Sequence, residues 1–407
     1  MNSVDIFSMA LGLESPWFVS EVKFEVSPEK GNKELHIYID FAKGSKFLLD
    51  DGLSYNAYDT EDRTWQHLNF FEHVCYLHAR VPRVTVASGK VRTVSVPWSR
   101  KGSGFTLLFE AYVMLLIDSE MPVCKVAKCL NTTAPRIWRI FNYWIERAVS
   151  NDDLSSVCEV GIDETSSKKG HDYVSLMVDM ATHRVIDVQE GKDKSVVENF
   201  AHTLEAKGGN RKHIEQVCID MSASFIAGTL GMFSNASLTF DKFHLIQHAN
   251  NAMDEVRKLE RKGNEAIKKH KYTFLKDQNK LSKSKKGELD YLLMNYPVLG
   301  EAYRLKEMFR DTFKIVNPDE AKSYLLFWCD LANDSGIQPF KKLVAMIKTH
   351  WFGIVNYFDS NITNGVLEGI NSKIQLIKRR ARGYRNIKSF INMIHFCCGK
   401  LKFDYPH

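Results

Sequence analysis

The pattern of hydrophobic and polar residues changes several times along the chain. Over residues 1–100, stretches such as VKFEVS, ELHIYIDF and VPRVTVASGKVRTVSV alternate apolar and polar positions and are separated by Gly, Asn and Pro. Alternation with a period of two is typical of strands that turn one face to a core. This part of the chain is therefore predicted to be β-rich, and the basic, glycine-containing segment WSRKGSG at 98–104 is predicted to be a linker.

Residues 105–149 show the period of a helix instead. The segments FTLLFEAYVMLL, PVCKVAKCL and NTTAPRIWRIFNYWIERA predict three helices, of which Pro122 starts the second and Thr132 or Thr133 caps the third. A helix, a short turn and a helix form a helix-turn-helix. Arg136 and Arg139 would then face a DNA groove, whereas the alternative is a three-helix structural bundle, and the pattern leaves both open.

From residue 157 strands and helices alternate. VCEVGIDE, YVSLMVDMA and RVIDVQE predict three strands, KSVVENFAHTLEAK a helix, IEQVCID a strand, SFIAGTLGMF a helix and ASLTFDKF a fifth strand. This order, βββ-α-β-α-β, is that of the ribonuclease-H-like fold, in which the ends of the first and fourth strands lie side by side. Residues 243 to about 360 predict an all-helical insertion, after which NGVLEGINSKIQLIKRRARGYRN resumes the fold.

Two aspartates stand where the first and fourth of these strands are predicted to end, Asp163 and Asp220. On adjacent strands their carboxylates would converge, and a cation is the usual remedy for the repulsion. Oxygen ligands favour Mg²⁺ or Mn²⁺. Phosphodiester chemistry with two metals needs a third carboxylate, and Glu368 is the candidate. The polar stripe of its predicted helix consists of Asn364, Glu368, Asn371 and Gln375.

Simpler explanations for these acids stay open. An acid at a strand end often caps the following helix or turn, and Asp220 before MSAS could do so. Glu164 and Asp179 are rival acids, although Glu164 should point to the other face of its strand from Asp163. His244 and His248 lie one helical turn apart, but without a third ligand they are predicted to be polar residues that line or border the cleft.

The distribution of charge favours a polyanionic partner near Glu368. The net charge of +6 is mild, but residues 369–403 contain nine Lys or Arg and no acid. This run begins one turn after Glu368, where a phosphate backbone would lie, although a solvated surface is the common alternative. DNA contacts are predicted for Lys373, Lys378, Arg379, Arg380, Arg382 and Arg385.

Composition excludes several classes of protein. A chain of 407 residues that is 44% hydrophobic can form two or three domains with cores of their own. None of the eight cysteines forms a C-x-x-C pair, so buried free thiols are expected rather than disulfides. The N-terminus lacks the basic start of a signal peptide, and the apolar run FTLLFEAYVMLLI is too short to span a membrane. A soluble cytoplasmic protein is expected.

Long blocks of the sequence resemble a known family. GIDETSSKKGHDYVSLMVD, CIDMSASFIAG, TFDKFHLIQHAN and ITNGVLEGINSKIQLIKRRARGYRN resemble blocks of the ISL-three family of bacterial insertion-sequence transposases. YDTEDRTWQHLNFFEHVCYLHARVPRV and VPWSRKGSGFTLLFEA resemble its N-terminal part, so the likeness runs nearly from end to end. It implies a D-D-E transposase that uses Mg²⁺, for which Mn²⁺ can substitute. The family's triad falls on Asp163, Asp220 and Glu368.

The N-terminal part departs from this family in one respect. Members typically carry a small zinc-binding module whose ligands are cysteines. The corresponding stretches, FLLDDGLSYNAYDT and PRVTVASGKV, contain none, and a tetrahedral zinc site cannot be built from their side chains. No zinc is therefore predicted. The ligand positions hold Leu48, Asp51, Tyr55 and Val86.

The expected fold is a multidomain α+β protein with a ribonuclease-H-like catalytic core interrupted by an all-helical insertion. The protein is expected to bind the terminal inverted repeats of an insertion sequence in double-stranded DNA and then to catalyse metal-dependent strand cleavage and strand transfer. It is expected to act as a homodimer or larger assembly in a bacterial cell. Two alternatives are a domesticated or inactive copy that only binds DNA, and a nuclease that only hydrolyses it. The predicted parts are a β-rich DNA-binding domain at 1–100, a helix-turn-helix domain at 101–150, the first part of the core at 151–245, the insertion at 246–360 and the C-terminal core helices at 361–407.

Overall fold

The chain forms two compact units. A computed structural model describes residues 3–26, 31, 33–168, 172–262, 264, 267–276, 280–360 and 365–404. One unit comprises Met1–Ala148 with Lys402–His407, and the other comprises Val149–Leu401. Each unit has a hydrophobic core of its own. The finer division into five domains stays a prediction.

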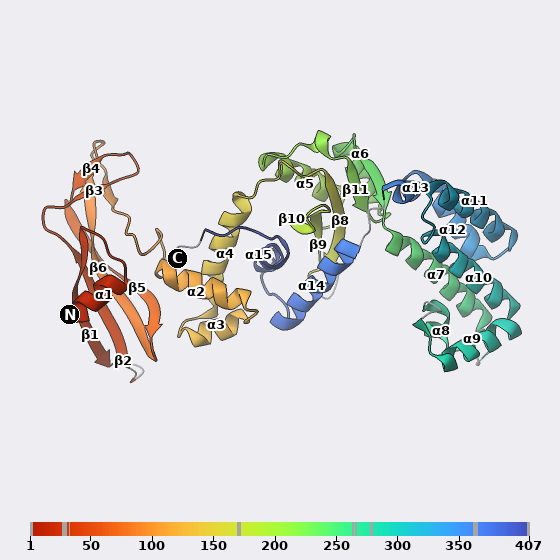
Figure 1. Ribbon diagram of the computed structural model, residues 1–407, viewed down its shortest axis with the longest axis horizontal. Coiled ribbons are helices and arrows are strands. Elements are labelled where there is room, and N and C mark those ends of the chain that lie inside the picture. The colour runs from red at the N-terminus through yellow and green to blue at the C-terminus, as the bar shows by residue number, and fades with distance from the viewer. Residues whose placement is uncertain are drawn as a thin grey trace. The chain divides into compact units, whose positions relative to one another are not determined.

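The first unit contains the predicted β-rich region (Figure 1). Its largest sheet has the order β1-β2-β6-β5, with β7 paired to β6, while β3 and β4 form a separate hairpin. Buried residues alternate along β2 and β6, as at Leu35, Ile37 and Ile39, because one face of the sheet packs on the core. The elements are α1 (Ser3–Ala10), β1 (Trp17–Val26), β2 (Lys33–Phe41), β3 (Lys46–Leu48), β4 (Ser54–Asn56), β5 (Asp59–Phe70), β6 (His73–Thr85) and β7 (Val91–Thr93).

Packing and hydrogen bonds stabilise the region around β3 and β4, which corresponds to the zinc-binding module of the family that the sequence resembles. Asp51 accepts hydrogen bonds from the Leu53 amide at 3.0 Å and from the Tyr55 hydroxyl at 2.9 Å. Val86 is buried in the core of the unit, whereas Leu48 is exposed. These four positions therefore serve the hairpin and the core.

Three helices follow the sheet: α2 (Leu107–Asp118), α3 (Val123–Cys129) and α4 (Ala134–Ser150). They confirm the three helices predicted from periodicity, with Pro122 as the residue that caps α3. Glu110 of α2 is fully buried, and burying a carboxylate is costly unless it is paired. It accepts hydrogen bonds from Arg100 Nε at 2.8 Å, Ser103 Oγ at 2.6 Å and Trp144 Nε1 at 2.8 Å, so this polar network joins α2 to α4 and to the preceding segment.

The second unit is built on a five-stranded mixed sheet with the order β10-β9-β8-β11-β12. β8, β11 and β12 are parallel, and β9 is antiparallel to both of its neighbours. The predicted order βββ-α-β-α-β and the adjacency of the first and fourth strands are confirmed. The elements are β8 (Glu159–Ser166), β9 (Tyr173–Asp179), β10 (Arg184–Glu190), α5 (Lys194–Ala206), the 3₁₀ turn η1 (Arg211–His213), β11 (Gln216–Ile219), α6 (Ala223–Met232) and β12 (Ser237–Phe240).

One predicted boundary in this sheet was wrong. Asp163 does not end its strand, because β8 continues to Ser166. β11 stops at Ile219, but on the other side of β8 the ladder with β9 runs on to the pair Ser166 and Tyr173. Asp163 therefore lies where β8 loses one of its two neighbours.

Helices make up the rest of the second unit. Between α7 and α13 the described residues contain no strand, as predicted for the insertion. α13 packs closely on β12: a Cβ atom added at Gly353 would lie 2.4 Å from the Phe240 ring, and Asn356 donates a hydrogen bond to the Leu238 carbonyl at 2.9 Å. These helices are α7 (Lys242–Glu260), α8 (Lys271–Leu275), α9 (Lys283–Asn295), α10 (Pro297–Thr312), α11 (Pro318–Asp334), α12 (Gln338–Thr349), α13 (Trp351–Ser360), α14 (Gly365–Ala381) and α15 (Ile387–Cys398).

Two further findings concern the whole described chain. No helix in the described ranges is long and apolar enough to cross a membrane. All eight cysteines are free, as predicted. The expected burial holds for Cys75, Cys218, Cys329 and Cys398, whereas Cys397 is half-buried and Cys124, Cys129 and Cys158 are exposed.

Candidate active site

Three parallel strands of the second unit lead into a row of aspartates. Cys218 of β11 is paired with Gly161 of β8, and Ile219 of β11 with Phe240 of β12. Continuing this register places Asp220 between Asp163 and Asp241. Neighbouring strands lie about 5 Å apart, so the three carboxyl groups come from adjacent positions. Asp241 was missed in the sequence, although TFD at the end of the fifth strand repeats the pattern of CID at the end of the fourth.

Asp163 is held through both carboxylate oxygens. Its Oδ1 accepts a hydrogen bond from the Glu164 amide at 2.8 Å, and its Oδ2 accepts one from Asn371 Nδ2 at 2.6 Å. Burial raises the pKa of Asp163 to about 6, and the charges of Asp241 and Asp220 act in the same direction. The charged form of Asp163 is therefore disfavoured, because burial and the neighbouring aspartates outweigh the hydrogen bond from the Glu164 amide and the charge of His244.

Asp220 combines both roles that the sequence left open. Its Oδ1 accepts a hydrogen bond from the Ser222 amide at 3.0 Å, so it does cap the turn that leads into α6. The side chain is half-buried, and this bond uses one of its two oxygens. Capping therefore fixes the carboxylate at the strand end without removing it from the row.

Asp241 orients the predicted neighbour His244. Asp241 is buried and caps α7 by accepting a hydrogen bond from the Phe243 amide at 2.7 Å. Its other oxygen lies 2.7 Å from His244 Nδ1, and this hydrogen bond raises the pKa of His244, with Asp163 and Asp220 adding to the effect. These aspartates therefore favour the protonated form of His244, in which the side chain carries positive charge beside the aspartate row.

α14 is seated on β8 along one stripe of side chains. A Cβ atom added at Gly161 would lie 3.1 Å from both δ carbons of Leu367, so the missing side chain makes room for the helix. Four helical residues rise about 6 Å and two strand residues about 6.6 Å, so contacts can repeat in step. From one end to the other, the contacts are Leu367 on Gly161, Asn371 on Asp163, Gln375 Nε2 to Thr165 Oγ1 at 3.2 Å, and Lys378 Nζ to the Ser166 carbonyl at 2.5 Å.

The predicted third acid lies on this helix but beside the contacting stripe. Glu368 follows Leu367 directly and is exposed. No group of three or more His, Cys, Asp or Glu side chains within the described ranges is arranged to hold a metal ion. The structure thus brings Asp163 and Asp220 together, and the assignment of Glu368 stays a prediction. Asn364 lies outside the described residues.

The donor atoms at the row suit a hard divalent cation. Two carboxylates come from adjacent strands, and Asn371 adds an amide oxygen, Oδ1, that is buried and has no hydrogen-bond partner. Carboxylate and amide oxygens are ligands that Mg²⁺ and Mn²⁺ accept. These residues are therefore of the chemical types that such an ion binds.

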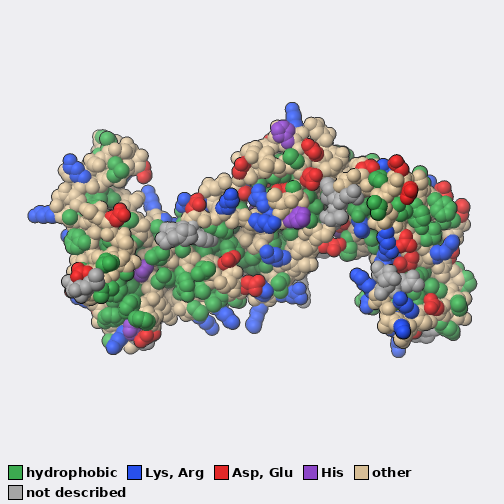
Figure 2. Space-filling view, viewed as in Figure 1, with side chains coloured by type: hydrophobic (Ala, Val, Ile, Leu, Met, Phe, Trp, Pro, Cys, Tyr) green, Lys and Arg blue, Asp and Glu red, His purple; other side chains and the backbone are tan. Residues whose placement is uncertain are grey.

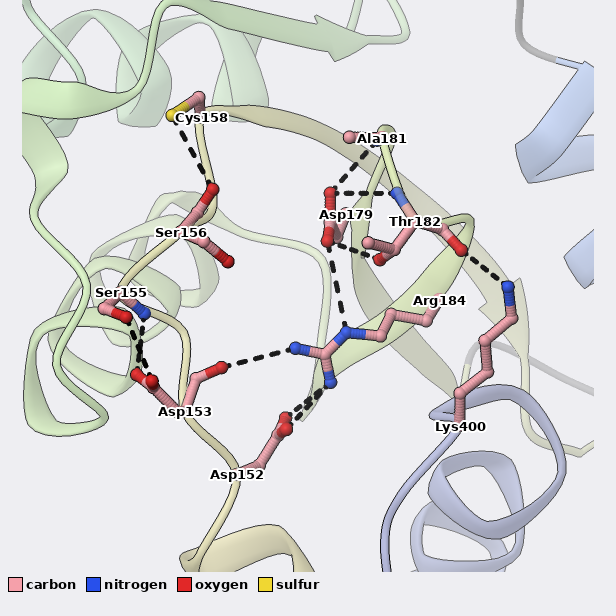
Figure 3. Close-up of polar contacts among 10 residues, drawn as sticks. All are labelled: Asp152, Asp153, Ser155, Ser156, Cys158, Asp179, Ala181, Thr182, Arg184 and Lys400. Carbon is pink, nitrogen blue, oxygen red and sulfur yellow. Dashed lines mark hydrogen bonds and ion pairs between the residues drawn. The ribbon is translucent and has the colours of Figure 1, made fainter.

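The rival acids have other partners. Strand alternation directs Glu164 away from Asp163, and its carboxylate lies 4.0 Å from Lys192 Nζ. Asp179 serves the β9–β10 turn: it accepts a hydrogen bond from the Ala181 amide at 3.0 Å and a shorter one from the Thr182 hydroxyl. Figure 3 shows this turn, with Arg184 between Asp179 and Asp152.

The predicted DNA-contacting residues divide into two groups. Lys373 donates to the Cys397 carbonyl and Lys378 to Ser166, so both ammonium groups have partners inside the unit. Arg379, Arg380, Arg382 and Arg385 are exposed, and Figure 2 shows basic side chains near the C-terminal end of α14.

The two predicted arginines of α4 also differ. The Arg136 guanidinium lies 4.4 Å from the centre of the Phe105 ring and is half-buried, whereas Arg139 is exposed. Stacking on a ring holds a guanidinium in place. Arg139 is therefore the more accessible of the two.

The three helices, and the mixed sheet with its aligned aspartates, lie largely within the residues matched by two family models of transposases. Residues 94–145 match the model described as the helix-turn-helix domain of transposase family ISL3, and residues 160–394 match a second model of that family, described as a transposase. The chain belongs to the transposase family ISL3, which confirms the ISL-three resemblance and favours the helix-turn-helix over the structural bundle.

Similar proteins extend over nearly the whole chain. The transposase for insertion sequence element IS1557 of Mycobacterium tuberculosis is 25% identical over 427 residues, covering 96% of this chain and 94% of the relative. The transposase for insertion sequence element IS1001 of Bordetella parapertussis is 25% identical over 378 residues, covering 89% of this chain and 91% of the relative. The similarity therefore spans both compact units.

Proposed function

We propose that this transposase cuts DNA at the ends of its own insertion element and joins the freed 3′ ends to target DNA, using divalent metal ions held by Asp163, Asp220 and Glu368. The observation that carries the proposal is the register of β8 and β11, which places two aspartates side by side beneath the helix that bears Glu368. The core would then be ribonuclease-H-like, as its strand order supports.

The chemistry would take place in two displacements at phosphorus. In the first, water attacks the phosphodiester at the element end, the bond to the 3′ oxygen breaks, and that oxygen gains a proton. In the second, the freed 3′-hydroxyl loses its proton and attacks a target phosphodiester, the bond from that phosphorus to the target's own 3′ oxygen breaks, and this oxygen gains a proton. Bound divalent cations would supply charge stabilisation at the attacking and leaving oxygens.

The residues of this chain have distinct tasks in such a reaction. The Glu164 amide and Asn371 hold the Asp163 carboxylate in one orientation, and the Ser222 amide does so for Asp220. The exposed arginines at the end of α14 would bind phosphates on either side of the reacting bond.

DNA binding would involve both units. α4 would read the terminal inverted repeats through Arg139, while the β-rich region adds contacts. Two element ends must be paired before joining, so a homodimer or larger assembly on double-stranded DNA is expected in the bacterial cytoplasm.

The test is a strand-transfer assay with a duplex that ends in a free 3′-hydroxyl, in Mg²⁺ and in Mn²⁺. Asp163→Asn, Asp220→Asn and Glu368→Gln each keep the shape of a side chain and remove one anionic oxygen. Transfer should fall by orders of magnitude in all three, while binding to element ends persists. Glu164→Gln is the matched control, since strand alternation directs this side chain away from Asp163 and its carboxylate lies 4.0 Å from Lys192 Nζ.

Each failure has a separate meaning. Near-normal transfer by Glu368→Gln shows that another residue is the third ligand. Cleavage of element ends by the unaltered protein without any transfer identifies a nuclease. Binding without either reaction identifies an inactive or domesticated copy.

A further inference from the structure

The Asn371 side chain of α14 donates a hydrogen bond to the aspartate row. Its Nδ2 lies 2.6 Å from Asp163 Oδ2, across 208 positions of sequence. An ionised carboxylate only accepts hydrogen bonds, so the amide nitrogen must face Asp163. The orientation of the amide is thereby determined by chemistry.

The other end of this amide is unsatisfied. Asn371 Oδ1 is buried and has no hydrogen-bond partner. Leaving a buried polar atom unpaired is unfavourable, because the atom loses its hydrogen bonds to water and gains none in return. Because Oδ1 and Nδ2 share one carbon atom, the unpaired oxygen lies beside the same carboxylate. A cation at the aspartate row would satisfy this oxygen.

We propose that Asn371 belongs to the metal site, where its Nδ2 fixes Asp163 and its Oδ1 supplies a neutral oxygen ligand to the divalent cation. This inference rests on the proposed function, since it assumes that Asp163 and Asp220 hold the ion. It adds a ligand that carries no charge, and such a ligand strengthens binding without increasing the repulsion between the carboxylates.

A purely structural role for Asn371 makes a different prediction. Gln375 lies one turn further along the same stripe and donates a hydrogen bond to Thr165 of β8 at 3.2 Å. It helps to seat α14 in the same way, but its partner is a threonine and not an aspartate of the row. Gln375→Leu is therefore the matched control for Asn371→Leu, because both changes remove one amide contact between α14 and β8.

The experiment measures binding of Mn²⁺ to the full-length protein by electron paramagnetic resonance, with and without duplex DNA. Asn371→Leu should weaken the affinity by about 10–100-fold, the loss typical for residues that support a metal site. Asn371→Asp should retain binding, because it keeps an oxygen at the position. Gln375→Leu should change the affinity by less than about threefold. If Asn371→Leu does not fold, Asn371→Ser takes its place, and its affinity for Mn²⁺ is compared with that of Asn371→Asp.

The outcomes separate the inference from the proposed function. Suppose that Asp163→Asn abolishes Mn²⁺ binding, as the proposed function requires. Equal losses of affinity in Asn371→Leu and Gln375→Leu, or no loss in either variant, would then overturn the inference alone. Absence of Mn²⁺ binding in the unaltered protein, even with element-end DNA, would instead refute the metal site and the inference with it.

Discussion

The seat of α14 on β8 depends on the absence of a side chain at Gly161. A methyl group added there would lie 2.7 Å from Met180 Sδ and 3.1 Å from each δ carbon of Leu367. Favourable contacts between such atoms occur at about 3.5–4.0 Å. The Met180 side chain is flexible and can move aside, but Leu367 belongs to a helix that is also held by Asn371 and Gln375. Gly161→Ala should therefore push α14 away from β8 by up to about 1 Å.

The expected cost is that of overpacking a core, about 1–3 kcal/mol. For a unit of this size, each kcal/mol lowers the melting temperature by about 2–4 °C. Catalysis should suffer more than stability, since a misplacement of about 1 Å can cost on the order of 10²-fold in rate. The Asn371–Asp163 contact and the position of Glu368 both depend on where this helix lies.

Calorimetry and the strand-transfer assay together test this reasoning. Gly369→Ala is the control, because a Cβ atom there meets nothing within 4 Å and the residue lies on the same helix. Alanine should stabilise that position by up to about 1 kcal/mol. A Gly161→Ala protein that keeps both the melting temperature and the transfer rate of the parent would refute the seating of α14.

Two further predictions concern pH and DNA recognition. Burial, with a smaller effect of Lys207, lowers the pKa of His395 to about 3. The contribution of neutral His395 to folding stability is complete above the unfolded pKa of about 6.5 and is lost as the pH falls towards 3. The free energy of unfolding of the second unit should therefore fall by about 2 kcal/mol between pH 6.5 and 5. Denaturant unfolding at pH 7.5 and 5 checks this, and an equal acid loss in His395→Gln would contradict it. Arg139→Ala should remove the preference for element ends when binding is measured in competition with unrelated duplex. Arg136→Ala should chiefly lower folding stability, because it removes the contact with the Phe105 ring. If Arg139→Ala keeps the preference for element ends, another surface of the protein carries the specificity.

The sequence by itself determined the order of the elements. Strand and helix periods are local, so the β-rich start, the three helices and the order βββ-α-β-α-β could be predicted, and so could the adjacency of β8 and β11. Asp163 and Asp220 stood out because an acid directly after an apolar strand is costly in a core. The family resemblance then supplied the transposase class, which the comparison with family models confirmed.

Tertiary structure decided what depends on contacts between distant segments. The exact end of β8 is set by its ladder with β9, which continues past Asp163 after β11 has stopped. Asp241 joins the aspartate row only through the register of β12. Lys378 carries the same charge as its neighbours in sequence, yet its ammonium group binds Ser166 instead of facing solvent.

The partner of Asn371 is the clearest case of such a contact. Periodicity placed it on a polar stripe with Glu368, but a helix carries no information about which strand that stripe will meet. Packing of Leu367 into the space at Gly161 sets the helix in step with β8, and Asn371 then falls on Asp163 while Glu368 stays exposed. Period and polarity are properties of a segment, whereas register between segments is a property of the folded core.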